Sequence, residues 1–521
     1  MRLLIFHGYL LRGTGSNIYN ASLAQTLAEL GHEVHILCQD RHADELDFVD
    51  AVGRWDGAEL RLEPGGGRPA RVTAYLPDIG PILPVYVADR YEGFEAKRFL
   101  DLSSSELEHY LDRNVAAARE VVKRARPDIA LANHLLMGPV VLARALEGRV
   151  PFAVKVHGSA LEYTLRPDPD RFLPFAREGI EAATGVLVGS RHMAERLWEL
   201  LPECRARTRL GPPGVDVKRF RPRPPEEAAT ALQALAGRLT GAAARWGTEQ
   251  GAAAALRALD PTRDTLVSFV GKLIVSKGID LLLAAWPLVV ERVPSARLCV
   301  VGFGTYRQAA ERLVAALGDS DLDAVREIAA RGRELEGGPA GELRFLKAFL
   351  EGLRGARRDA YLAAAGDAAR RVHFTGRLDH HDLPDLLPGC RAQVVPSTFP
   401  EAFGMVAAEA AACGVLPLSA THSGLAEVSS LLASSLDERV RPLLGFELGD
   451  GAVEEIATKL VAWLTLAPAD RQRAAGALAA TAADRFGWEH VAEGVIAAAE
   501  GRLDALPEAT PASESWRPRS G

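Results

Sequence analysis

Short apolar strands alternate with helical segments along most of this chain. The first stretch has an apolar run at residues 3–6, leucines at helical spacing that end at Gly31, and a second apolar run at 34–37. A strand, a helix and a strand in this order form the βαβ unit of a parallel sheet. Further apolar runs lie at 128–132, 152–156, 185–188, 266–270, 298–301, 372–375 and 392–395. The alternation predicts an α/β fold, and glycine or polar residues just after several runs fit ligand binding at strand ends.

A proline-rich segment at residues 212–225 divides this pattern into two series. An Ala-rich helical stretch at 226–258 follows it, and the second series of strands begins at residue 266. A length of 521 residues also exceeds what one domain usually holds. We therefore expect two Rossmann-like α/β domains that face each other across a cleft. Their predicted bounds are 1–215 for the N-terminal domain, 216–263 for a linker with a helical insertion, and 264–485 for the C-terminal domain.

Three further segments extend this plan. Residues 306–370 are helical, rich in Ala and Arg and mixed in charge, and we expect a helical insertion in the C-terminal domain. Residues 486–506 are expected to form a last helix that packs back on the N-terminal domain. The tail at 507–521 is rich in Pro and Ser, and its composition predicts disorder.

Composition excludes several classes of protein. The net charge of −7 provides no basic footprint for nucleic acid. The five cysteines are scattered and form no C-x-x-C motif, which favours reduced thiols in a cytoplasmic protein over disulfides or zinc. No secretory signal is recognisable, and no apolar stretch approaches the ~20 residues of a membrane span. Peripheral contact with a membrane is left open.

Two glutamates around a glycine are the strongest chemical signal. Glu401 and Glu409 flank Gly404, which opens a small-residue helix just after a buried strand. Gly404 lets backbone approach a ligand closely, and the helix N-terminus can hold an anion. Both carboxylates can reach one ligand across the helix start, one taking sugar hydroxyls and the other a ribose diol. The alternative is a pair of solvated glutamates on an Ala-rich helix.

The order of several motifs resembles a known family. The chain resembles the retaining, GT-B-fold glycosyltransferases of family 4 over about four fifths of its length. The E-x7-E pattern of Glu401 and Glu409 is that family's signature. The other matching blocks are 13–17, 31–34, 214–220, 270–278, 301–304, 374–376, 396–397 and 486–488.

The resemblance implies a role for each matching residue. Glu409 would hold the donor ribose, and Glu401 would contact the transferred sugar or phosphate. His157 would lie near the reacting carbon of the sugar, where a histidine can donate a hydrogen bond to a hydroxyl; a packed histidine at a strand end is the alternative. The other donor-binding candidates are Gly13, Gly15, Gly271, Arg377, Leu378, Phe403, Gly404, Met405 and Val406, and the acceptor-side candidates are Asn17 and His134.

Lys272 and Lys277 lie in the loop that follows the strand at 266–270. When a nucleotide-sugar donor breaks, negative charge develops on the β-phosphate, and two fixed ammonium groups would stabilise it without a metal. The family usually carries Arg at the position of Lys272. A lysine keeps the positive charge, but it cannot form the two parallel hydrogen bonds that a guanidinium makes with a phosphate. The alternative is two surface lysines near a helix start.

Other motifs indicate a function less strongly. Asp319, Asp321 and Asp323 contain a D-x-D pattern, but it lies in the helical insertion, where a helix cap is the better interpretation. His380 and His381 are a thin ligand set, so no metal is predicted. The glycines at 13 and 15 lack the third glycine of a dinucleotide fingerprint. Glu162 is a weaker site candidate, and we expect a surface glutamate there.

The sequence therefore predicts a retaining glycosyltransferase that moves a sugar from a nucleotide-sugar donor to an acceptor of unknown identity, without a cofactor. The resemblance implies that the departing phosphate takes the acceptor's proton. Three alternatives stay open: a GT-B-fold phosphorylase, a nucleotide-sugar epimerase, and an inactive nucleotide-sugar-binding protein. A nicotinamide oxidoreductase is disfavoured by the incomplete glycine fingerprint.

Overall fold

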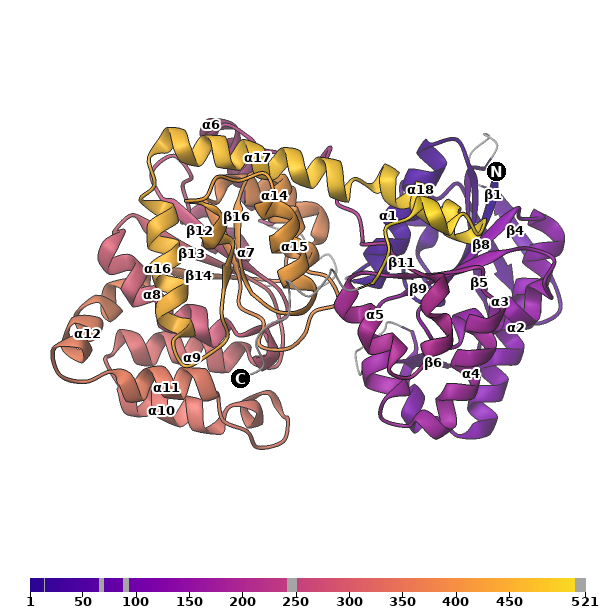
Figure 1. The fold of residues 1–521 in the computed structure, drawn as a ribbon, viewed down its shortest axis with the longest axis horizontal. Coiled ribbons are helices and arrows are strands. Elements are labelled where there is room, and N and C mark those ends of the chain that lie inside the picture. Colours follow the sequence, from indigo (N-terminus) through magenta and orange to yellow (C-terminus); the bar gives the residue numbers. More distant parts are fainter. Residues whose placement is uncertain (14, 65–69, 88–92, 241–250, 511–521) are drawn as a thin grey trace. The chain divides into compact units, whose positions relative to one another are not determined.

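The computed structural model describes residues 1–13, 15–64, 70–87, 93–240 and 251–510 (Figure 1). The chain divides into two compact units, which we call unit 1 and unit 2. Unit 1 comprises Met1–Gly214 together with the segment that begins at Trp488, and unit 2 comprises Val215–Gly487. Each unit contains a mainly parallel sheet with helices, so the predicted α/β class is confirmed.

Unit 1 contains a nine-stranded sheet in its described residues, in the order β11-β10-β9-β8-β1-β2-β5-β3-β4. All neighbours are parallel except β3 and β4. The strands are β1 (Arg2–Phe6), β2 (Glu33–Leu37), β3 (Ala51–Trp55), β4 (Leu60–Pro64), β5 (Val72–Pro77), β8 (Ile129–Asn133), β9 (Phe152–Val156), β10 (Gly185–Val188) and β11 (Thr208–Leu210). Because β1, β8 and β9 are neighbours and parallel, the residues that follow them meet at one edge of the sheet.

The helices of unit 1 pack against this sheet. They are α1 (Ser16–Glu29), α2 (Ser104–Ala125), α3 (Gly138–Leu146), α4 (Pro169–Ala182), α5 (Arg191–Trp198) and α18 (Trp488–Ala499). β6 (Ile82–Val85) and β7 (Glu95–Arg98) form a separate two-stranded sheet. The last helix, α18, lies beside α1 (Figure 1), and Trp488 and Val495 join Leu23 in one core.

The start of the C-terminal tail differs from the expectation. The backbone N–H of Leu210 donates to the carbonyl of Pro507 at 2.9 Å, and Arg209 forms a β-bridge with Glu508. The prediction of disorder is therefore wrong for residues 507–510, because the edge of β11 supplies backbone partners. Residues 511–521 of the predicted tail lie outside the described residues.

Unit 2 contains a six-stranded parallel sheet in the order β14-β13-β12-β15-β16-β17. Its strands are β12 (Thr265–Val270), β13 (Ala296–Val301), β14 (Val372–Gly376), β15 (Ala392–Val395), β16 (Leu416–Ala420) and β17 (Gly445–Phe446). Its helices are α6 (Pro225–Arg238), α7 (Ala252–Arg257), α8 (Ile279–Arg292), α9 (Arg307–Gly318), α10 (Leu322–Arg331), α11 (Arg344–Gly352), α12 (Gly355–Arg370), α13 (Leu383–Leu386), α14 (Met405–Ala412), α15 (Ser423–Ala433), α16 (Ala452–Leu464) and α17 (Pro468–Phe486).

The segments expected as a linker and as an insertion belong to the core of unit 2. Leu232 on α6 and Leu256 on α7 are buried in it, and part of the expected helical stretch, 241–250, lies outside the described residues. Helices α9 to α12 occupy residues 307–370, and the Tyr361 hydroxyl donates to the carbonyl of Ala284 on α8 at 2.9 Å. The Asp321 side chain caps α10, as its position suggested, by accepting from the N–H of Ala324 at 2.9 Å.

Within the described ranges, no helix is both long and apolar enough to cross a membrane. All five cysteines are buried and carry free thiols.

Candidate active site

The loop between β12 and α8 carries Lys272 and Lys277 and is held by backbone contacts. The N–H of Leu273 donates to the carbonyl of Phe303 at 2.7 Å. From the helical insertion, Glu336 accepts from the N–H of Val275 at 2.7 Å. Gly278 has a φ of +64°, and a Cβ there would collide with the carbonyl oxygen of Pro396. Glycine at 278 thus lets Lys277 lie directly beside the segment that follows β15.

Lys277 forms an ion pair with Oε1 of Glu401. The hydroxyl of Ser397 donates to the same oxygen at 2.6 Å, and the N–H of Glu401 donates to the hydroxyl of Ser423 at 2.8 Å. Burial alone would raise the pKa of the Glu401 carboxyl, but Lys277 and Ser397 outweigh it and the pKa is lowered. Glu401 is therefore an oriented carboxylate at neutral pH.

Gly404 connects this pair to the start of α14. Its φ is +122°, a backbone conformation that residues with a side chain rarely adopt, and a Cβ would lie 2.6 Å from a methyl carbon of Leu425. Met405 is the first residue of the helix, and Val406 accepts from the side-chain amide of Gln393 through its carbonyl at 2.7 Å. Phe403 packs on Phe486 with ring centroids 5.5 Å apart. The helix start thus presents partly positive backbone N–H groups beside Glu401.

Glu409 lies one turn into α14 and is only 2% exposed. Its Oε1 accepts from Nε2 of His380 at 2.8 Å. Burial would lower the pKa of His380, but the Glu409 carboxylate outweighs it and the pKa is raised. The His380 ring also packs against Phe220, at 5.3 Å between centroids. The sequence suggested His380 only as a metal ligand, and the described part of the chain contains no group of three or more His, Cys, Asp or Glu side chains that could hold a metal ion.

The remaining donor-binding candidates of unit 2 lie at the ends of β12, β13 and β14. Gly271 follows β12, and its carbonyl approaches Gly302 so closely that a Cβ on Gly302 would not fit. The Arg377 guanidinium lies 5.0 Å from the ring centroid of Phe303, and Leu378 is buried.

The candidates of unit 1 gather where β1, β8 and β9 end. His7 follows β1, Asn133 ends β8 and His157 follows β9. His157 Nε2 lies 2.8 Å from Oδ1 of Asn133, and His7 Nε2 lies 3.0 Å from Oδ1 of Asn17 on α1. Gly13 and Gly15 have φ values of +109° and +60° in the loop before α1. His7 was not among the residues expected from the sequence, although it follows a strand as His134 and His157 do.

His134 is a buried histidine with an uncommon backbone. Its φ is +66°, and neither ring nitrogen has a hydrogen-bond partner among the described residues. The ring packs 5.0 Å from that of His157 and 4.7 Å from that of Tyr86. Burial lowers the pKa of His134 well below its ordinary value, so the ring is neutral. A buried polar group without a partner is costly.

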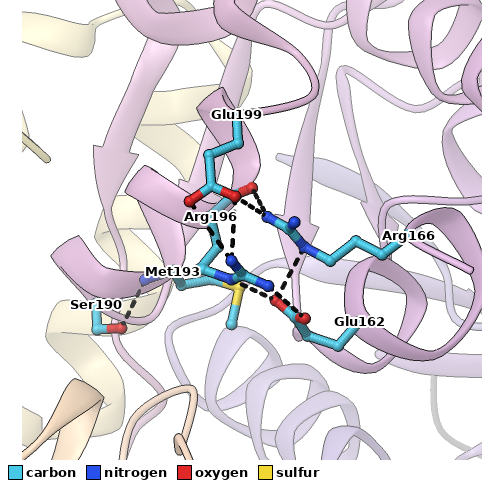
Figure 2. Close-up of polar contacts among 6 residues, drawn as sticks. All are labelled: Glu162, Arg166, Ser190, Met193, Arg196 and Glu199. Carbon is cyan, nitrogen blue, oxygen red and sulfur yellow. Dashed lines mark hydrogen bonds and ion pairs between the residues drawn. The ribbon is translucent and has the colours of Figure 1, made fainter.

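Glu162 is not the solvated surface residue that we expected. It lies in a π-helical turn at Leu161–Leu165 and accepts two hydrogen bonds from Arg196 on α5, each at 3.0 Å (Figure 2). Arg166 and Glu199 complete a network in which two positive and two negative charges balance. Ser190 caps α5 by accepting from the N–H of Met193 at 3.2 Å.

Two family models match the chain. One, described as a glycosyl transferase 4-like domain, matches residues 14–214, and the other, described as glycosyl transferases group 1, matches residues 357–432. A relative from Frankia alni, named D-inositol 3-phosphate glycosyltransferase, is 26% identical over 499 residues, which cover 92% of this chain and 93% of the relative.

Two solved structures share the fold across both units. Sucrose-phosphate synthase from Thermosynechococcus elongatus has a TM-score of 0.53 at 18% identity, covering 97% of this chain and 100% of its own. The Anabaena protein HepE, in complex with UDP and glucose, has a TM-score of 0.53 at 16% identity with the same coverage. The fold and the family matches define an enzyme of the GT-B glycosyltransferase class. The chain is similar to a glycosyl transferase 4-like domain over residues 14–214 and to group 1 glycosyl transferases over residues 357–432.

Proposed function

We propose that this enzyme is a retaining glycosyltransferase that uses a nucleotide-sugar donor and needs no metal ion. The observation that carries the proposal is the Lys277–Glu401 ion pair at the start of α14, one helical turn before the buried Glu409. Cation, carboxylate and helix start lie together, which is what a sugar diphosphate requires.

The donor would lie across the start of α14. Glu409 would accept hydrogen bonds from the ribose hydroxyls, since an ionised carboxylate offers only acceptors. The backbone N–H groups at Gly404 and Met405 would face the diphosphate. The UDP and glucose in the HepE structure support a uridine nucleotide as the base to test first.

The lysines would stabilise the leaving group. As the bond between the sugar's anomeric carbon and the β-phosphate oxygen breaks, Lys272 and Lys277 would neutralise the charge that develops on the diphosphate. Glu401, released from Lys277 by the phosphate, would contact the sugar. The acceptor oxygen would bond to the same face of the anomeric carbon, and its proton would pass to the departing phosphate oxygen.

The acceptor that we propose to test first is a phosphorylated polyol. The supporting observation is the name of the Frankia relative, whose alignment spans nearly the whole chain. Inositol 3-phosphate represents this class, and unphosphorylated inositol is the matched control.

Product analysis tests the reaction. The enzyme is incubated in EDTA with UDP-sugars and each acceptor, and the anomeric configuration of the product is read by NMR. We expect a glycoside of the donor's own configuration together with free UDP. An inverted product would overturn retention, loss of turnover in EDTA would overturn metal independence, and a requirement for inorganic phosphate would favour the phosphorylase.

A further inference from the structure

Five side chains of unit 1 form one continuous hydrogen-bonded chain, and we infer that this polar chain fixes His157 as the tautomer that carries its proton on Nε2. In order, its members are Asn17, His7, Asn20, Asn133 and His157. With Nε2 engaged, His157 has only the Nδ1 lone pair to offer a ligand. It therefore accepts a hydrogen bond, in contrast to the donating role that the sequence suggested.

His7, which is buried, determines which atom donates and which accepts in each hydrogen bond of the polar chain. Its Nε2 lies 2.9 Å from the carbonyl oxygen of Leu10, and a carbonyl only accepts, so Nε2 carries the proton. The orientation of Asn17 agrees, because its Nδ2 donates to the carbonyl of Arg12 at 2.7 Å and leaves Oδ1 facing His7. Burial lowers the pKa of His7 to about 4, so the ring is neutral and Nδ1 is an acceptor.

The donors and acceptors of two asparagines follow from the protonation of His7. Asn20 Nδ2 donates to Nδ1 of His7 at 3.0 Å and to the carbonyl of Ser16 at 2.8 Å, so Oδ1 of Asn20 is left as an acceptor. Asn133 Nδ2 donates to that oxygen at 2.6 Å and to the carbonyl of Phe6 at 3.3 Å. A backbone carbonyl orients each amide, which distinguishes its oxygen from its nitrogen.

The polar chain ends at His157. Its Nε2 faces Oδ1 of Asn133, which is an acceptor, and therefore carries the proton. Burial lowers the pKa of His157 well below its ordinary value, and His134 and Lys155 act in the same direction, so the ring is neutral. The ring is partly exposed, and Nδ1 has no hydrogen-bond partner within the part of the chain that the structure describes.

The consequence for the ligand rests on the proposed function and on the family resemblance, which implies that His157 lies near the reacting carbon of the transferred sugar. A sugar hydroxyl can donate to Nδ1, whereas a phosphate or carboxylate oxygen would place its lone pair against another lone pair. His7, Asn20 and Asn133 are then positioning residues that make this position select a hydroxyl over an anionic oxygen.

The first test reads the tautomer directly and needs no activity. Wild-type protein labelled with ¹⁵N-histidine is recorded at neutral pH by long-range ¹H–¹⁵N correlation, and His157→Gln identifies the signals of His157. We expect a protonated Nε2 and an unprotonated Nδ1. A proton on Nδ1, or a doubly protonated ring, overturns the inference whatever the enzyme's reaction is.

Two variants of Asn133 test the polar chain itself. Asn133→Leu removes the acceptor, so the His157 signals should become a mixture of both tautomers. Asn133→Asp keeps an acceptor and adds negative charge, so the Nε2 proton should remain and the pKa of His157 should rise. Asn114→Leu is the matched control, because Asn114 is a buried asparagine that donates to the carbonyl of Tyr110 at 2.8 Å, outside the polar chain. Unchanged His157 signals in both Asn133 variants contradict the inference.

Two isosteric variants test which ring atom meets the ligand. An asparagine at 157 places an amide oxygen near the position of Nδ1, whereas a glutamine reaches the position of Nε2. If the ligand donates to Nδ1, kcat/KM for donor consumption should be about three- to tenfold higher in His157→Asn than in His157→Gln, as expected for one hydrogen bond. The reverse order overturns the role of Nδ1. Wild-type turnover in both variants would overturn the proposed contact between Nδ1 of His157 and the sugar, even with the tautomer as inferred.

Discussion

Lys277 and Glu401 lie 124 residues apart in the sequence and form an ion pair in unit 2. Gly278 positions the lysine, because its lack of a Cβ allows the loop to approach Pro396. Ser397 and Ser423 position the glutamate through its carboxylate and its backbone N–H. Glu409 lies further along α14, the helix that starts beside this pair.

Replacing Lys277 with alanine should lower kcat strongly. Loss of one group that stabilises developing charge typically costs about a hundredfold or more, and the fold should survive because the lysine is partly exposed. Steady-state kinetics and a thermal melt check both points. Lys347→Ala is the matched control, since Lys347 pairs with Glu342 on the surface of the same unit. A near-normal kcat in Lys277→Ala would show that Lys277 does not stabilise the leaving diphosphate.

Replacing Glu409 with alanine should weaken nucleotide binding. Hydrogen bonds to a charged group contribute about 1.5–3 kcal/mol, so we expect the Kd for the nucleotide to rise roughly ten- to a hundredfold. Isothermal titration measures it, with the exposed Glu342→Ala as the control. An unchanged Kd would show that the ribose lies elsewhere.

His380 should make the stability of unit 2 depend on pH. Glu409 outweighs the effect of burial and raises the pKa of His380, so the folded protein holds this proton more tightly than the unfolded chain does. The contribution is fully present below the ordinary pKa of about 6.5 and is lost as the pH rises through the folded value.

The measurement compares urea unfolding of the wild type and His380→Gln across this range. The free-energy difference between the two proteins should shrink as the pH rises. A difference that stays constant or grows would show that the pair is not ionic. Asp216 and Arg219 are the other charged groups that act on His380, and they are the same in both proteins.

Gly278→Ala should destabilise the enzyme by about 1–3 kcal/mol, because its φ is positive and the added Cβ collides with a backbone oxygen. The affinity for nucleotide should fall as well, since the loop carries Lys277. Gly237→Ala on α6 is the control: nothing lies near its Cβ, and alanine favours a helix, so it should be neutral or slightly stabilising. Equal stability of the two variants would contradict this account of the loop.

The sequence predicted many of the strands, including the edge strand β14, but it missed the buried strands β5 and β16 and the edge strands β4 and β11. Continuous apolar runs such as residues 152–156 form strands as expected, because parallel strands covered on both faces are apolar throughout. β4 contains Arg and Glu within five residues and β11 has only three residues, so neither produces such a run. The sequence did not predict the order of the strands in either sheet. The polar chain depends on that order, because β1, β8 and β9 are neighbours in the sheet but not in the sequence.

The residues of the candidate site that belong to a sequence motif could be predicted. The E-x7-E pattern and the lysine loop pointed to Glu401, Glu409 and Lys277, which the structure places in one unit. The partner of Glu409 was not predictable, because the contact with His380 depends on the path of the loop after β14. The end of β1 could have identified His7, since polar residues follow β8 and β9 in the same way.

Binding of UDP in the absence of metal tests the central claim most directly. The melting temperature is measured in EDTA with UDP, GDP, ADP and their sugar conjugates, for the wild type, Lys277→Ala and Glu409→Ala. A ligand that binds only the folded state must raise the melting temperature. The account predicts that one nucleotide series raises it in the wild type and raises it much less in both variants. No rise with any nucleotide in the wild type, or an equal rise in all three proteins, would contradict it.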